Sequence, residues 1–125
     1  MKIFLNSQNI ANIENYANGS VEDLDIGNTM DFTPYNNRLQ FIQNLVPKLK
    51  HNGTLQIKGL DILLFSKELL YGSGKKVSLA DANSLLQLAS FSHMNEMVTM
   101  FEQSGLKLVS KKYSQVYYHI CVKRP

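Results

Sequence analysis

The hydrophobic and polar positions along the chain repeat with two alternating periods, which predicts strands and helices in turn. Short apolar or alternating runs bounded by turn-forming residues are typical of strands. They predict strands at residues 2–5, 21–28, 54–58, 106–112 and 116–123. Apolar residues spaced three or four apart are typical of amphipathic helices. They predict helices at residues 8–19, 36–50, 61–72 and 92–105, with a further short helix opening at Ser78.

The second helical pattern and the strand after it contain two positions that restrict the backbone. Leu39, Ile42 and Leu45 are among the apolar residues that define this helix. Pro47 is expected to kink the helix or to start its last turn afresh, because proline cannot donate the backbone hydrogen bond. The His-Asn-Gly segment at 51–53 predicts a turn with one residue at positive φ.

The order of these elements predicts the fold class. Strands and helices alternate through the first three strands, and further helices precede a pair of strands at the end. Such alternation is typical of an α/β fold with a mostly parallel sheet, and the closing pair predicts an antiparallel hairpin. A chain of 125 residues suits a single domain, which we place at residues 1–125.

Composition excludes several classes of protein. The single cysteine, Cys121, excludes an internal disulfide and a cysteine-based zinc site. The three histidines have no spacing that indicates a shared metal site, so no metal is expected. No apolar run reaches the length that spans a membrane, and the N-terminus lacks the apolar stretch of a signal peptide. We therefore expect a soluble cytoplasmic protein.

Basic residues are concentrated near the end of the chain: Lys107, Lys111, Lys112, Lys123 and Arg124. This pattern is typical of a solvated face, and a phosphate-binding patch is the alternative interpretation. Tyr113, Tyr117 and Tyr118 lie among these residues and could stack on bases, but alternating tyrosines are also ordinary strand composition. A net charge of +3 is mild, so nucleic acid is not an expected partner.

Residues 45–61, LVPKLKHNGTLQIKGLD, resemble the region around the fifth strand of class I S-adenosylmethionine (SAM)-dependent methyltransferases. In that family a helix ending in a sequence like LKPGG precedes a strand and an acidic residue. Here residues 49–53 take that place, with His-Asn instead of Pro-Gly. Residues 102–125 resemble the last helix and closing hairpin of the family. The chain is most similar to the short methyltransferase-like proteins of cyanobacterial phages, which implies the cytoplasm of the host.

Several parts of the family pattern are missing from this chain. The family's glycine-rich cofactor loop follows its first strand, but here Asn6-Ser7-Gln8-Asn9 contains no glycine. The space between Asn9 and Val21 suffices for one helix, so residues 21–28 correspond to the family's fourth strand. Its second and third strands, and the acidic residue that holds the ribose, are absent. Residues 28–35 do not match the family's NPPY-type motif.

The resemblance implies a three-layer Rossmann-like fold with a reduced sheet. In the family's numbering the expected strand order is 1-4-5-7-6, ending in the antiparallel hairpin. Removal of the second and third strands leaves the first strand at the edge of the sheet. An apolar edge strand invites pairing with another chain. We therefore expect a homodimer or a complex with a partner protein through residues 2–6.

Open α/β sheets bind ligands beyond the carboxyl ends of their strands. The residues expected there, and therefore the candidates for contact with SAM, are Asn6, Ser7, Asn28, Asp31, Gly59 and Asp61. Turn and cap chemistry is the alternative interpretation, because Asn, Ser and Asp favour such positions. Asp61 in particular could cap the helix that begins at Ile62. No catalytic residue is identified.

Two functional hypotheses follow. The first is a truncated methyltransferase-like domain that lacks the SAM loop and the ribose-binding strand and acts as a non-catalytic or partner-dependent binding module. The second is a minimal SAM-dependent methyltransferase that is active as a homo- or hetero-oligomer. The missing motifs favour the first hypothesis, and the family resemblance favours the second. Fold alone does not establish an activity.

Overall fold

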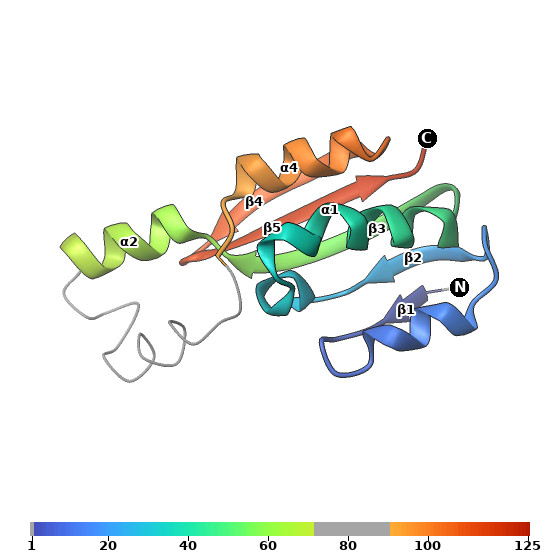
Figure 1. The fold of residues 1–125 in the computed structure, drawn as a ribbon. Coiled ribbons are helices and arrows are strands. Elements are labelled where there is room, and N and C mark those ends of the chain that lie inside the picture. The colour runs from blue at the N-terminus through green and yellow to red at the C-terminus, as the bar shows by residue number, and fades with distance from the viewer. Residues whose placement is uncertain (1, 72–90) are drawn as a thin grey trace.

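The computed structural model describes residues 2–71 and 91–125, which form a five-stranded sheet in the order β1-β2-β3-β5-β4 (Figure 1). The strands are β1 (Lys2–Phe4), β2 (Val21–Asp25), β3 (Leu49–Leu60), β4 (Lys107–Ser114) and β5 (Tyr117–Lys123). The helices are α1 (Arg38–Leu45), α2 (Ile62–Tyr71) and α4 (Met94–Gln103). Four short 3-10 segments complete the description: η1 (Ile10–Asn15), η2 (Thr29–Phe32), η3 (Tyr35–Asn37) and η4 (Val46–Lys48).

The sheet is mixed. β1, β2 and β3 pair in parallel, whereas β5 pairs antiparallel with both β3 and β4. β4 and β5 are consecutive along the chain and turn at Gln115, which has a φ of 55°. The expected α/β class is confirmed. The short helix predicted to open at Ser78 lies outside the described residues.

Local structure departs from the expected helices where polar residues or proline interrupt them. Only residues 10–15 of the first predicted helix are helical, and they form the 3-10 segment η1. Asn12 and Asn15 lie within it, and asparagine competes with the backbone for the hydrogen bonds of an α-helix. Pro47 does start the last turn afresh, since η4 follows α1 as a separate 3-10 turn with proline near its first position.

β3 begins five residues earlier than predicted. Its extra residues include segment 51–53, so the prediction of a turn there is wrong. Asn52 in this segment does have the expected positive φ, at 64°. The Asn52 N–H donates to the carbonyl of Arg124 (2.6 Å), and the Arg124 N–H donates to the carbonyl of Gly53 (2.9 Å). These bonds to the far end of the chain extend the strand, and no local sequence pattern reveals them.

The helical elements η1, α1 and α4 pack on one face of the sheet. Inward-pointing strand residues such as Leu24, Leu55 and Ile120 form one core with side chains from all three elements, including Ile13, Ile42 and Phe101. Helix α2 instead packs beyond the end of β3, where Phe65 contacts a second small core.

The expectation of three layers is therefore wrong for the described residues, which form two layers. β1, β2 and β3 follow one another across the sheet, so both parallel connections cross in the same direction. Such crossovers are right-handed, which places η1 and α1 on the same face. Helices on both faces would require the direction of crossing to reverse.

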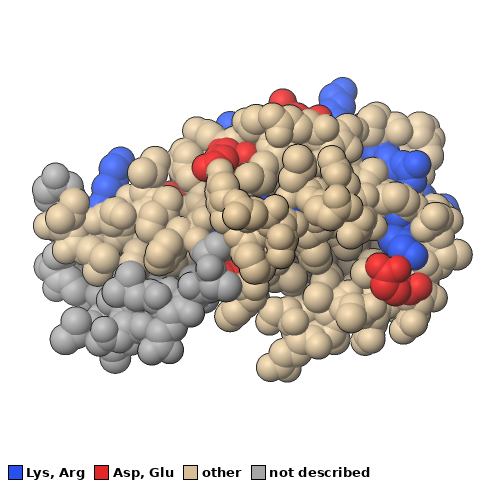
Figure 2. All heavy atoms as spheres, in the orientation of Figure 1, with Lys and Arg blue, Asp and Glu red and all other residues tan. Residues whose placement is uncertain are grey.

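The opposite face of the sheet, which we call the open face, is polar. It carries the outward-pointing residues Lys2, Phe4, Asp23, Asp25, Thr54, Gln56, Lys58, Lys112, His119 and Cys121. Asp23 accepts hydrogen bonds from Thr54 (2.8 Å) and Gln56 (3.2 Å) and lies 3.7 Å from Lys2. Seen from the helical side, by contrast, the surface is mostly uncharged (Figure 2). None of the described helices has the length and hydrophobicity to span a membrane.

Candidate functional site

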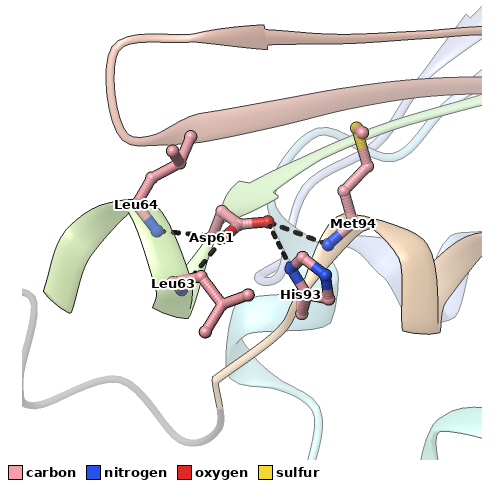
Figure 3. A network of polar contacts seen from close by, with 5 residues as sticks. All are labelled: Asp61, Leu63, Leu64, His93 and Met94. Carbon is pink, nitrogen blue, oxygen red and sulfur yellow. Dashed lines mark hydrogen bonds and ion pairs between the residues drawn. The ribbon is translucent and has the colours of Figure 1, made fainter. Parts of the chain in front are cut away.

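Asp61 lies immediately after β3 and organises the carboxyl end of the sheet (Figure 3). It is completely buried. One carboxylate oxygen accepts the backbone N–H groups of Leu63 (3.0 Å) and Leu64 (3.2 Å), at the start of α2. The other accepts the N–H of Met94 (2.9 Å), at the start of α4, and lies 3.1 Å from Nδ1 of His93. A single side chain thus caps two helices.

The cap suits a carboxylate because each helix begins with unpaired N–H groups and a partial positive charge. α4 has no capping bond from its own N-cap residue, His93. Asp61 supplies that bond from the position after β3, more than thirty residues earlier in the chain. The interpretation of Asp61 as a helix cap is thus confirmed for α2, and the second capped helix was not foreseen.

Asp31 is a second buried carboxylate at the same end of the sheet. Both of its oxygens accept the backbone N–H of Leu60, at 3.2 and 3.3 Å. Burial raises the pKa of Asp31 to about 6, although the Leu60 N–H and the nearby Arg38 guanidinium lower it. The carboxyl group is therefore protonated more readily than an exposed aspartate, whose pKa is near 3.8.

Arg38, which sequence analysis missed, lies in the same buried cluster. It is fully buried on α1, with Nη1 3.8 Å from the sulfur of Met97. Leu39, which was expected to face the core, is instead 38% exposed. The signal was present in the sequence: Arg38, Ile42 and Leu45 share one helical face at spacings of four and three.

Gly59 is packed against a tyrosine rather than exposed to a ligand. It pairs with Tyr118 on β5, and a Cβ added at Gly59 would overlap the Tyr118 phenol ring. Tyr118 is fully buried, and this burial raises the pKa of its hydroxyl. The neighbouring Ser92 side chain has the opposite effect and lowers that pKa. Glycine is therefore required here for close packing.

Asn6, Ser7 and Asn28 follow β1 and β2 at the same end of the parallel strands. The Asn6 side chain accepts the N–H groups of Gln8 (2.9 Å) and Asn9 (3.1 Å) within one turn. Asn28 is exposed, and its carbonyl accepts the N–H of Asp31 at 3.0 Å. Asp31 thus bonds to the residue that precedes Asp61, whereas the Asn6 side chain bonds within its own turn.

No protein-family model matches the chain, and no curated protein matches it. Solved structures do resemble it. An O-methyltransferase family protein from Burkholderia thailandensis superimposes with a TM-score of 0.61 at 11% identity, over 90% of this chain and 32% of that one. A SAM-dependent methyltransferase from Archaeoglobus fulgidus gives a TM-score of 0.62 at 8% identity, over 91% and 64%. A possible histamine N-methyltransferase from Thermotoga maritima gives 0.62 at 14%, over 88% and 58%.

These similarities show the fold. The chain shares its α/β fold with these methyltransferase structures, and it spans between about a third and two thirds of their length. Identities this low carry no information about substrate or activity.

The double cap predicts a large loss of stability when Asp61 is replaced by asparagine. The amide keeps one acceptor but presents an NH2 group to one of the backbone donors, which leaves a buried N–H unpaired. We expect Asp61→Asn to lower the free energy of unfolding by about 2–4 kcal/mol in urea titrations. The control Asp25→Asn keeps the one acceptor that receives the Gly27 N–H and should cost less than about 1 kcal/mol. Equal losses in the two variants would contradict the cap.

The raised pKa of Asp31 predicts a specific pH dependence. Between pH 3.8 and about 6 the folded protein holds a proton that the unfolded chain has released, so stability falls as pH rises through this window. The change amounts to about 3 kcal/mol, at about 1.4 kcal/mol for each pKa unit. Asp31→Asn should remove this pH-dependent component. In urea titrations, the free energy of unfolding of the variant should therefore rise relative to that of the wild type from pH 4 to 6. A difference that is constant with pH would refute the assignment.

Proposed function

We propose that the chain is a methyltransferase-like binding module that does not transfer methyl groups by itself and works through a partner chain. The observation that carries this proposal is the double cap by Asp61. Open α/β sheets bind ligands beyond the carboxyl ends of their strands, using free polar groups. Here the buried carboxylates at that end already accept backbone N–H groups of the protein itself.

The loop after β1 supports the same proposal. A cofactor loop needs small residues that let the backbone approach the ligand. In this chain the side chain of Asn6 is engaged by the backbone of its own turn. The polar groups at the ends of β1 and β3 are therefore used for structure. SAM remains the cofactor to test, because the similar structures include proteins described as SAM-dependent methyltransferases.

The partner in this proposal is a second copy that pairs with β1. β1 is an edge strand, and no strand of residues 2–71 and 91–125 covers its outer side. The Leu5 N–H donates inward to Asp25 (2.8 Å), so by alternation the N–H and C=O of Phe4 point outward. Phe4 is also 64% exposed. Two such edges related by a twofold axis would pair in the same way on both copies.

SAM binding is expected to be absent. Thermal unfolding of the wild type should show no rise in melting temperature at millimolar SAM. A ligand at about a hundred times its dissociation constant would add about 2.7 kcal/mol, which is a shift of several degrees for a chain of this size. A rise that appears only at protein concentrations where the chain is dimeric would instead favour the minimal, oligomer-dependent methyltransferase.

The edge pairing predicts a dimer whose stability depends on the backbone of Phe4. Light scattering after gel filtration should give twice the mass of the chain for the wild type and for Phe4→Ala, which keeps the outward N–H. Phe4→Pro removes that N–H without removing a bond to β2, and it should be monomeric. A monomeric wild type, or a dimeric Phe4→Pro, would refute pairing through β1.

A further inference from the structure

Three neighbouring strands place three basic side chains in one row on the open face. Lys58 on β3 pairs with His119 on β5, and His119 pairs in turn with Lys112 on β4. Residues paired in this way point to the same side of a sheet, with Cβ atoms about 5 Å apart. The row therefore concentrates positive charge within a short distance.

The two lysines disfavour a positive charge on His119, which lies between them. Like charges directly opposite each other destabilise a sheet. Burial lowers the pKa of His119, Lys58 and Lys112 lower it further, and only the more distant strand residue Asp25 raises it. Within residues 2–71 and 91–125, neither lysine forms an ion pair with a carboxylate. The Lys58 ammonium instead lies 4.8 Å from the centre of the Tyr117 ring.

A cavity of about 370 Å³ lies over this row. Lys58, His119 and Lys112 form part of its lining, and the remaining polar lining includes Gln56, Ser110 and Asp25. This volume is in the range of small-molecule sites, which begins at about 300 Å³. It exceeds the space that a phosphate group needs, so a larger molecule could lie across the neighbouring strands with hydrogen-bond donors toward Asp25.

We propose that this cavity binds the phosphate group of a small molecule between Lys58, His119 and Lys112. Lysine ammonium groups are established phosphate binders because they act as compact positive charges, and charge-assisted hydrogen bonds to phosphate are stronger than neutral ones. The Ser110 hydroxyl in the adjacent row can donate a further bond. The site is on the other side of the sheet from Asp61 and does not depend on the function proposed above.

The test is a nuclear magnetic resonance titration of the full chain with inorganic phosphate and, separately, with ribose 5-phosphate, at ionic strength held constant with sodium chloride. We expect saturable shifts at the backbone amides of the three basic residues and a rise in the pKa of His119. Tighter binding of ribose 5-phosphate would assign the site to a phosphorylated molecule, and equal binding would assign it to free phosphate. No saturable shift with either compound would overturn the proposal.

Matched variants separate a phosphate site from a general charge effect. Lys58→Gln and Lys112→Gln should each weaken phosphate binding about tenfold. Lys107→Gln removes the same charge from the same strand as Lys112 but lies outside the cavity lining, so it should change affinity less than about twofold. Equal effects of all three substitutions would refute the site.

The same two lysine variants also test whether Lys58 and Lys112 serve only to stabilise the sheet. Without phosphate, Lys58→Gln and Lys112→Gln should each raise the pKa of His119, because each removes a positive charge that lowers it. If the lysines served only to stabilise the sheet, their removal would lower the melting temperature and leave phosphate affinity unchanged. This second result would contradict the proposal even where phosphate causes small spectral changes.

Discussion

The buried carboxylate of Asp61 connects the elements at the carboxyl end of the parallel strands. A charge moved out of water is costly unless hydrogen bonds replace its hydration. Asp61 accepts three backbone N–H groups and contacts His93, and these donors belong to two helices and the segment before the second. Its own N–H bonds to Val116 (2.8 Å), and the next N–H, from Ile62, bonds to Ser92 (2.7 Å). The end of β3 is thus joined to α2, to α4 and to the strand connection of the hairpin.

The hydrogen bonds of the buried carboxylates bear on where the sheet can bind a ligand. In open α/β sheets the carboxyl ends of the strands are where ligands usually bind. Here Asp31, Asp61 and the Gly59–Tyr118 contact fill that end with internal hydrogen bonds and packed side chains. Our proposals therefore place other molecules elsewhere, on the edge strand β1 and on the open face. Both follow from a sheet whose two parallel connections cross in one direction, because within residues 2–71 and 91–125 this places η1 and α1 on the same face.

The sequence located the helices and strands well, but it revealed much less about which side chains are buried and which residues they contact. Period-two and period-3.6 patterns located all five strands and the helices at α1, α2 and α4, since apolar spacing reflects which side of an element faces the core. The same patterns placed Leu39 inward and overlooked Arg38, because an arginine on the apolar side of a helix contradicts the usual rule until its partners are known. The second helix capped by Asp61 was also hidden, since its partner Met94 is distant in the sequence.

By itself, then, the sequence determined the α/β class, the order of the elements, the positive φ within residues 51–53 and the helix cap after β3. These features depend on interactions between residues that are close along the chain. Only the tertiary structure decided that η1, α1 and α4 occupy one face, that Asp31 and Arg38 are buried together, and that Lys58, His119 and Lys112 form one row. Each of these depends on which strands become neighbours, and neighbouring strands pair residues as far apart in the chain as Thr54 and Lys123.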